Sequence, residues 1–224
     1  MAHTAPKTNV AHTAPKTNVA HTAQAPAAYA VLNPKQRQCG YPFKGLAGVG
    51  VAFCFVLALR SRLRATGWFR GVEPNLKRYL DLVCIGTVAD IVPLVGVNRA
   101  LVSWGLRELA ASTRPGLKAL IEVSRLRPGM ISAEDIAFRL APRINAVGRL
   151  SSADMALRLL TTRSAAQAAS SAAALDAANS ERQNIEGEIL KEALLMHGAM
   201  EPSGKAVVLA SEGWNAGVIG IVAS

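Results

Sequence analysis

A long stretch without proline constrains the fold of this chain more than any other feature. From Ser164 to about Met196 the sequence is rich in Ala, Gln, Glu and Lys, and Gly187 is its only glycine. Residues of these types favour helix, and no proline interrupts them. We therefore expect one long, partly exposed helix that connects two parts of the molecule.

Shorter helices and two strands are expected on either side of it, giving an α/β chain with a mostly helical middle. Ser132 begins one helix, because Asp135 follows it at the spacing of a capping box. The apolar run from Leu46 to Leu59 is too short to span a bilayer, and we expect a buried helix there. The expected strands are residues 28–32 and 205–210, and the other expected helices are residues 74–89, 98–111, 115–124, 132–140 and 153–160.

One carboxylate stands out in the apolar stretch from Gly86 to Leu94. Asp90 is flanked on both sides by Val, Ile and Ala residues, and Pro93 ends the run. Burial of a carboxylate in such surroundings is costly unless a metal ion, a cation or several hydrogen-bond donors compensate it. Asp90 is therefore a candidate metal ligand. The alternative is a structural carboxylate that caps the next turn or pairs with Arg99.

The N-terminal end of the sequence is a short exact repeat. Residues 2–10 read AHTAPKTNV, residues 11–19 repeat them, and a third copy begins at residue 20. The repeat has too few apolar side chains to form a core and its prolines oppose helix, so we expect a disordered or extended tail over residues 1–27. Its histidines recur without a nearby carboxylate or cysteine, which is poor evidence for a metal site.

Positive charge is concentrated in one part of the chain. Residues 35–78 contain nine Lys or Arg and one acid, whereas residues 151–224 contain five basic and eight acidic residues. A clustered positive field attracts polyanions, so nucleic acid bound through its phosphates is one interpretation and an acidic membrane is another. Because few aromatic residues are available for base stacking, we expect contacts mainly to a nucleic-acid backbone.

The chain has three cysteines, none of them in a Cys-x-x-Cys pair. An odd number without that spacing argues against a disulfide framework and a zinc site, and it suits a reducing cytoplasm. Cys54 and Cys84 lie in apolar runs, where a cysteine is most simply a small core residue.

The block from Arg143 to Arg149 contains groups suited to phosphate. Two guanidinium groups and the Asn145 amide surround a short turn that contains Gly148, so phosphate oxygens could be gripped bidentately. The alternative is a pair of surface arginines at the end of a helix. The residues alone favour this alternative, and they leave a second nucleic-acid-binding site here open.

Five further residues are candidates for contacts with nucleic acid. Asn98 and Arg99 could pair with Asp90 or a phosphate, although Asn98 could also only cap a helix. The segment from Gly213 to Ser224 is expected to be a strand-to-helix turn whose amides cradle phosphate. Trp214 is there either a stacking surface or core. The other candidates are Asn215 and Gly217.

Several blocks of the sequence, in order, resemble the RecJ family of single-strand-specific DNA exonucleases, which are DHH phosphoesterases. The resemblance covers residues 28–224, and agreement over that length is not expected by chance. The blocks are residues 33–36 (NPKQ), 43–53 (FKGLAGVGVAF), 79–82 (YLDL), 86–94 (GTVADIVPL), 141–150 (APRINAVGRL), 179–186 (NSERQNIE) and 213–224 (GWNAGVIGIVAS).

The resemblance implies an enzyme that binds Mn²⁺ or Mg²⁺ and degrades single-stranded DNA from its 5′ end. Asp90 is then a catalytic residue and a metal ligand, because paired metal ions activate water and stabilise the leaving oxygen. The family's early Asp-x-Asp, later lone Asp and Asp-His-His triplet are absent from this sequence, and Asn215 stands where many members have His. We therefore expect a fragment that lacks the N-terminal metal-binding motifs and is inactive alone.

The resemblance also implies a division into domains. Residues 28–97 are the C-terminal part of a Rossmann-like DHH domain, and residues 98–163 are a helical region with the nucleic-acid-binding motif. Residues 164–200 connect it to residues 201–224, the start of an α/β DHH-associated domain. The implied partners are single-stranded DNA and either single-strand-binding protein or other repair proteins, in the cytoplasm and without a membrane.

Three hypotheses for the function remain open at this point. The first is part of an active exonuclease of DNA repair and recombination. The second is a catalytically dead remnant that binds nucleic acid or a protein partner without cutting. The third is a related phosphoesterase that acts on short oligonucleotides or cyclic dinucleotides, although the block from Arg143 to Arg149 and the long connector favour the exonuclease.

Overall fold

The computed structural model describes residues 30–150, 152–198 and 206–223, and the chain divides into two compact units, residues 1–42 and 43–224. In the first unit, the described residues form turns, and Asn33 Oδ1 accepts a hydrogen bond from Lys35 N at 2.9 Å. The strand expected over residues 28–32 is wrong for residues 30–32. Residues 28–29 and the nonapeptide repeat lie outside the described residues.

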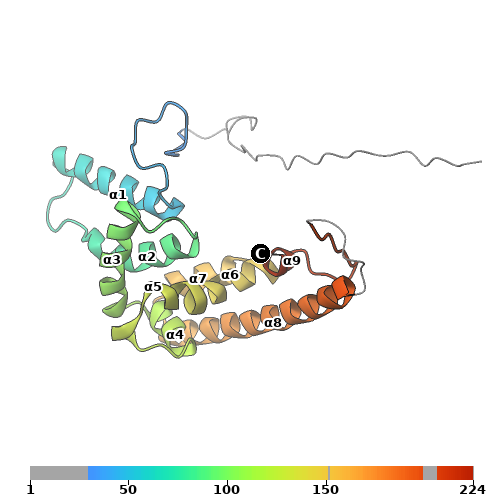
Figure 1. The fold of residues 1–224 in the computed structure, drawn as a ribbon. Coiled ribbons are helices and arrows are strands. Elements are labelled where there is room, and N and C mark those ends of the chain that lie inside the picture. Colours follow the sequence, from blue (N-terminus) through green and yellow to red (C-terminus); the bar gives the residue numbers. More distant parts are fainter. Residues whose placement is uncertain (1–29, 151, 199–205, 224) are drawn as a thin grey trace, which may run out of the picture. The chain divides into compact units, whose positions relative to one another are not determined.

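The second unit is built from helices (Figure 1). Four of the expected helices, at residues 74–89, 98–111, 115–124 and 153–160, are confirmed to within a few residues. The elements in chain order are α1 (Gly48–Ala65), η1 (Leu76–Tyr79), α2 (Leu80–Ala89), α3 (Gly96–Ala110), α4 (Pro115–Val123), η2 (Pro128–Met130), α5 (Ala133–Asp135), the π-helix η3 (Ile136–Leu140), α6 (Ala141–Leu150), α7 (Asp154–Thr161), α8 (Ala165–Gly198) and α9 (Ile219–Val222).

The strand expected over residues 205–210 is also wrong for the part that the structure describes. Residues 206–210 have no regular structure, and the side chains of Val207 and Val208 are 51% and 86% exposed. A strand exists only where a neighbouring segment pairs with its backbone, whatever its β propensity. No described segment pairs with these residues, so the α/β expectation is replaced by a mostly helical architecture over the described ranges.

The helix α2 lies against α3 and contributes five apolar side chains to the core. The two helices approach closely because α3 has a glycine at the contact. A Cβ atom on Gly105 would lie 2.4 Å from Leu80 O and 2.4 Å from Cys84 Cβ, so any larger residue would push the helices apart. The buried α2 side chains are Leu80, Val83, Cys84, Ile85 and Val88.

Asp81 is a buried carboxylate at the first turn of α2, with 3% of its surface exposed. Its Oδ2 accepts hydrogen bonds from Arg114 Nε at 2.9 Å and from Ser112 Oγ at 2.9 Å, while Leu82 N donates to Oδ1 at 2.8 Å. These contacts compensate the buried charge and join α2 to the segment that leads into α4.

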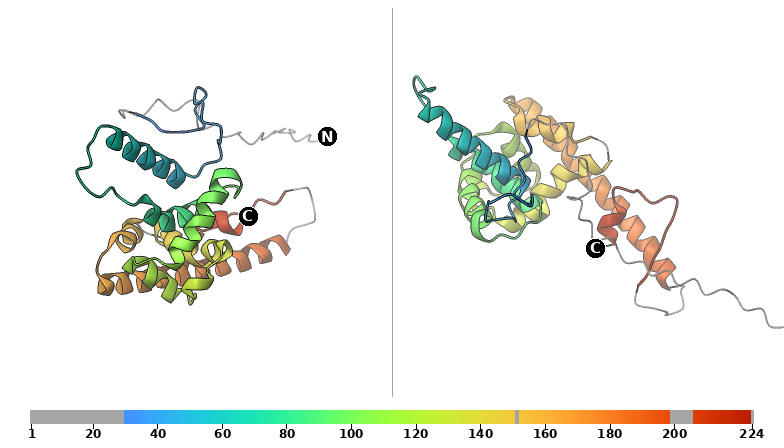
Figure 2. Two further views of the ribbon diagram at one scale, coloured as in Figure 1. Left: turned by 90° about the vertical axis from the view of Figure 1, so that its left-hand side faces the viewer. Right: turned by 90° about the horizontal axis from the view of Figure 1, so that it is seen from above.

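The long helix expected from Ser164 to about Met196 is confirmed as α8, which contacts α4, α6, α7 and α9. Figure 2 shows α8 from two further directions. Its buried residues recur every three or four positions, as on one face of a helix. Ala168 and Ala172 are small enough for close packing. The full buried set is Ala168, Ala172, Leu175, Asn179, Arg182 and Ile189.

The first helix, α1, is more exposed than its apolar sequence predicts. Gly50 is its only buried residue, whereas the side chains of Phe55 and Leu59 are 51% and 43% exposed. The expectation of a buried helix is therefore wrong, because within the described residues α1 makes its main helix contact with α2 alone. No helix among the described residues combines the length and apolar character needed to cross a membrane.

The helix expected over residues 132–140 is present but changes type partway. The capping box is confirmed: Asp135 N donates to Ser132 Oγ at 3.1 Å, and Ser132 N donates to Asp135 Oδ2 at 3.0 Å. Hydrogen bonds from Ser132 lower the pKa of Asp135. The next residues form the π-helix η3, in which Ala141 N donates to Ile136 O. Such π segments are rare and often lie at functional sites.

Candidate nucleic-acid interface

Asp90 occupies a different environment from the one expected. It follows the last residue of α2, its amide donates to Gly86 O at 3.1 Å, and its side chain is exposed. Among the described residues, neither the Asp90 carboxylate nor the Arg99 guanidinium has a hydrogen-bond or ion-pair partner. The expectation of a buried carboxylate, and the alternative of a pair with Arg99, are therefore wrong, since the chain leaves the core at the end of α2.

The residue after Asp90 has a costly backbone conformation. Ile91 has a φ of 53° and is 91% exposed. Glycine usually occupies this left-handed position after a helix, and a β-branched residue is an outlier there. Nothing about burial explains this strain, so it marks the turn at Asp90 as a candidate functional segment.

Asn98 is fully buried and fixes the turn that follows Asp90. Its Nδ2 donates to Gly45 O at 2.8 Å and to Pro93 O at 3.0 Å. A side chain with 0% exposure cannot reach a DNA strand. We therefore correct the expectation that Asn98 contacts nucleic acid: it holds the backbone around Pro93 in place.

The block from Arg143 to Arg149 is helical, and the expectation of a short glycine-containing turn is wrong. It lies within α6, where Gly148 has no special conformation. Arg143 points to α8, donating from Nε to Asp176 Oδ1 at 2.7 Å and from Nη1 to Arg139 O at 2.6 Å. Asn145 and Arg149 are exposed on another part of the helix. The three side chains therefore do not form one grip.

Arg149 is joined to the C-terminal turn, 68 positions along the chain. Its Nη1 donates to Gly217 O at 3.0 Å. A Cβ atom on Gly217 would lie 2.5 Å from Arg149 O, so this close approach of two backbones requires glycine. Arg149 and Gly217, both candidate site residues from the sequence, therefore lie together in the structure.

Three amides of the C-terminal turn are already used within the turn. Gly217 N donates to Asn215 Oδ1 at 2.8 Å, and the amides of Val218 and Ile219 donate to Asn215 O at 2.9 and 3.0 Å. The expected phosphate cradle therefore cannot use these three amides. The indole of Trp214 donates to Glu192 Oε2 at 2.8 Å, so Trp214 ties the turn to α8.

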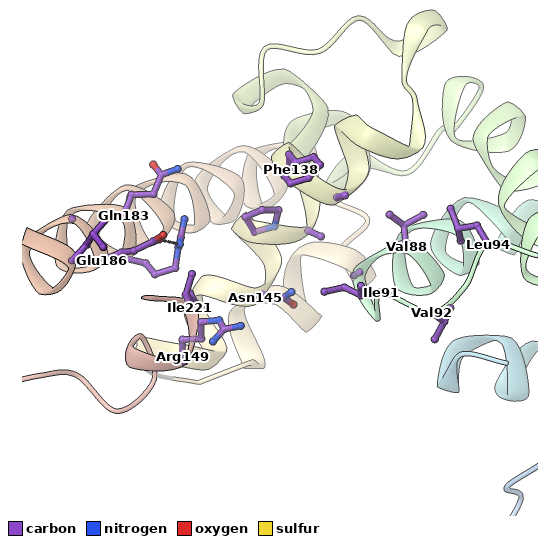
Figure 3. A pocket seen from close by; sticks show the side chains of 18 residues that line it. Val88, Ile91, Val92, Leu94, Phe138, Asn145, Arg149, Gln183, Glu186 and Ile221 are labelled. Carbon is purple, nitrogen blue, oxygen red and sulfur yellow. Dashed lines mark hydrogen bonds and ion pairs between the residues drawn. The ribbon is translucent and has the colours of Figure 1, made fainter. Parts of the chain in front are cut away.

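A pocket of about 1190 Å³ lies where the turn at Asp90, η3, α6, α8 and α9 meet (Figure 3). It contains Asn145 and Arg149 and the two neighbours of Asp90, but not the other expected site residues. Figure 3 shows Asn145 between Arg149 and Ile91. The lining residues are Val88, Ala89, Ile91, Val92, Leu94, Ala137, Phe138, Ala141, Pro142, Asn145, Arg149, Arg182, Gln183, Glu186, Gly187, Leu190, Gly220 and Ile221.

The helix α8 contributes polar residues to the pocket that were not among the candidate site residues. Arg182 is 9% exposed, pairs with Glu186 and donates from Nη2 to Asn179 Oδ1 at 3.3 Å. Its Nε is buried and has no hydrogen-bond partner among the described residues. One signal could have found it: Asn179 and Arg182 continue the core-facing spacing of Ala168, Ala172 and Leu175, where apolar residues belong.

The described residues do not form a complete divalent-metal site. No group of three or more His, Cys, Asp or Glu residues lies together in these parts of the chain. Asp90 offers one exposed carboxylate, and Glu186 is occupied by Arg182. A divalent ion such as Mg²⁺ or Mn²⁺ needs more oxygen ligands than Asp90 supplies.

Comparisons with known proteins give one consistent relationship. No family model matches the chain. The single-stranded-DNA-specific exonuclease RecJ of Dickeya dadantii is 45% identical over 207 residues, which are 89% of this chain and 36% of that protein. RecJ of Bacillus subtilis is 43% identical over 201 residues, 90% of this chain and 24% of that protein. The chain therefore spans about a third or less of the length of these relatives.

Solved structures agree with the sequence comparison. The crystal structure of RecJ in complex with Mg²⁺ from Thermus thermophilus has a TM-score of 0.71 and 40% identity, over 82% of this chain and 27% of that one. A structure of exonuclease RecJ bound to manganese has a TM-score of 0.66 and 42% identity, over 78% of this chain and 42% of that one. Sequence and fold thus agree that the matched residues are similar to one segment of the longer RecJ exonucleases.

Proposed function

We propose that this chain provides the strand-binding surface of a RecJ-type exonuclease that hydrolyses single-stranded DNA from its 5′ end in DNA repair and recombination. One observation carries the proposal. The pocket joins residues from the turn at Asp90, from α6, from α8 and from α9, and these segments match the blocks that carry the family resemblance. Relatives named for single-stranded-DNA-specific exonuclease activity support it.

The side chains of the pocket suit a phosphodiester backbone. Arg149 is exposed beside the pocket, and Asn145 adds an amide that can donate or accept. A guanidinium group binds phosphate oxygens bidentately, and its charge makes binding sensitive to salt. Arg99 is exposed on α3 and is proposed as a peripheral phosphate contact. Four other candidate residues are proposed to hold this surface in place. Arg143 and Trp214 contact α8, Asn215 accepts a hydrogen bond from Gly217 N, and Gly217 O accepts one from Arg149.

Asp90 is proposed as one ligand of the Mn²⁺ or Mg²⁺ that the solved relatives contain. It lies at the C-terminal end of α2, where the partial negative charge of the helix adds to that of the carboxylate and favours a cation. The remaining ligands would come from residues that the structure does not describe or from outside this chain. Its catalytic role therefore depends on them.

The domain boundaries within the chain are part of the same proposal. Residues 28–97 are proposed as part of a DHH domain, residues 98–163 as the helical region, and residues 164–200 as the connector to a DHH-associated domain that begins at residues 201–224. Single-strand-binding protein or other repair proteins are proposed partners, in the cytoplasm. The connector assignment is supported by the length of α8 and by its contact with α9.

A second candidate is a chain that binds single-stranded DNA without cutting it. The absence of a three-ligand group among the described residues favours this candidate for the polypeptide on its own. Both candidates require the same strand-binding surface, and they differ in whether nucleotides are released.

Digestion and binding of labelled single-stranded DNA test both candidates. The wild-type chain is incubated with 5′-labelled and 3′-labelled strands and Mn²⁺, and binding is titrated with salt, alongside Asp90→Ala and Arg149→Ala. Arg163→Ala is the matched control, because Arg163 is exposed and outside the pocket. Release that is lost in Asp90→Ala supports the enzyme, and salt-sensitive binding without release supports the second candidate. Equal affinity of Arg149→Ala and the wild type would contradict both.

A further inference from the structure

The pocket contains an aromatic side chain whose exposure the core does not explain. Phe138 lies in the π-helix η3, lines the pocket and is 75% exposed. Its neighbours on the same segment, Ile136 and Leu140, are both 0% exposed and hold η3 against the core. Phe138 is therefore turned outward by a segment that is itself firmly anchored. This placement leaves the Phe138 ring available to a ligand in the pocket.

The pocket is lined by both apolar and polar groups. In Figure 3, Phe138, Val88 and Ile91 are apolar, while Asn145, Arg149 and Gln183 carry polar ends. Arg182 adds a buried guanidinium whose Nε has no partner among the described residues. A buried, unpartnered donor that lines a pocket points to a ligand with a hydrogen-bond acceptor.

The pocket is large enough to hold one nucleotide of a polymer. Sites for small molecules usually have volumes of about 300–1,000 Å³, and this pocket has about 1190 Å³. A nucleotide of an unpaired strand has the matching chemistry: a flat apolar face for Phe138, ring oxygen and nitrogen atoms that accept hydrogen bonds, and a phosphate for Arg149. An acidic peptide would match the arginines but would leave the flat Phe138 face unused.

We propose that Phe138 is a stacking platform for one base of the bound single strand, with Arg182 donating to that same nucleotide. This inference rests on the proposed function and deepens it, because it assigns a base contact where charge alone predicts only backbone contacts. Stacking on an aromatic face is tolerant of sequence, since every base has such a face. The platform would therefore favour single strands with exposed bases over paired DNA without reading their sequence.

Binding measured by fluorescence anisotropy in EDTA tests this proposal without digestion. Two probes are used: a short labelled oligothymidylate, and the same backbone with abasic sites in place of its bases. We expect Phe138→Ala to weaken binding of the oligothymidylate about tenfold and to leave binding of the abasic strand unchanged. Phe138→Trp should retain the wild-type affinity, whereas Phe138→Leu should behave as Phe138→Ala because it lacks an aromatic face.

Two control variants separate the possible outcomes. Met130→Ala removes a side chain of matched exposure, 74%, outside the pocket, and should change neither affinity. Arg149→Ala should weaken binding of both probes, because it acts on the backbone. If Phe138→Ala weakens both probes equally, or neither, the platform is overturned while the Arg149 result still supports the proposed function. If the wild-type chain binds neither probe at low salt, both proposals fail.

Discussion

The two ends of α2 each carry an aspartate, and the two environments are opposite. Asp81, at the first turn, is 3% exposed and accepts hydrogen bonds from Arg114, Ser112 and the amide of Leu82. Asp90, at the other end, is exposed and has no side-chain partner among the described residues. The buried carboxylate of this segment therefore has a structural role, whereas the exposed one is free to bind a ligand.

The direction of the helix strengthens this difference. The N-terminal end of a helix presents amide groups and partial positive charge, which stabilise a carboxylate such as Asp81. The C-terminal end presents carbonyl groups and partial negative charge, which disfavour Asp90. Since no described residue compensates the charge of Asp90, its position lowers the stability of the fold slightly. A cation bound there would offset this cost.

The largest effect is expected where the buried ion pair is broken. Asp81→Asn keeps the size of the side chain but leaves the Arg114 guanidinium, whose side chain is 21% exposed, without its charge partner. We expect the free energy of unfolding to fall by about 3–5 kcal/mol, measured by urea unfolding with circular dichroism. Ser112→Ala, which removes one neutral donor, should cost less. If Asp81→Asn lowers the free energy of unfolding by less than Ser112→Ala does, Asp81 does not have this structural role.

A smaller effect is expected from filling the contact between α2 and α3. Gly105→Ala places a Cβ atom against the backbone of Leu80 and the side chain of Cys84, so the two helices must separate. We expect a loss of about 1–3 kcal/mol in the free energy of unfolding. The control is Gly129→Ala, where no atom lies within 4 Å. Equal stability of the two variants would show that the α2–α3 contact adapts freely.

The buried thiol near Asp81 makes stability depend on alkaline pH. Burial raises the pKa of Cys84 to about 12, and the nearby Asp81 charge adds to the shift. Because the unfolded chain loses this proton near its ordinary pKa and the folded chain keeps it, stability falls as pH rises. Between about pH 8 and pH 10 we expect a loss of about 1–2 kcal/mol from this thiol. Unfolding curves of Cys84→Ala should lack this component, and an identical pH slope would contradict it.

The smallest effect, with the opposite sign, is expected at Asp90. Asp90→Ala removes an uncompensated carboxylate from the C-terminal end of α2, so stability should stay unchanged or rise by about 0.3 kcal/mol. The measurement is the same urea unfolding, compared with Asp81→Asn. A loss above about 1 kcal/mol would mean that Asp90 has a structural partner. In that case, adding Mn²⁺ should raise the free energy of unfolding of the wild type no more than that of the variant.

Helices were predictable from this sequence because their signals are local. The absence of proline predicted α8, and the spacing of Ser132 and Asp135 predicted a capping box that the structure contains. Strands were not predictable, because residues 206–210 have β propensity without a described partner. The π-helix η3 was not predictable either, since the packing of Ile136 and Leu140 decides it and no local pattern marks it.

The candidate site was predictable only in part. Asn145 and Arg149 were selected from their chemistry, and both line the pocket. The burial of Asp81 instead of Asp90 depends on Arg114, which lies 33 positions away and whose contact no local pattern reveals. The burial of Arg182 is marked only by its spacing from Leu175, which places it on the buried face of α8.

The length of α8 has a consequence for how this sequence can change over generations. Its first half carries core residues and its second half carries Arg182, Gln183 and Glu186, with no loop between them. One inserted residue between Leu175 and Arg182 would rotate everything that follows by about 100°, turning the pocket wall away from α6. Insertions and deletions are therefore tolerable in the loops around this helix. Inside the helix only substitutions keep the core residues and the pocket residues on their faces.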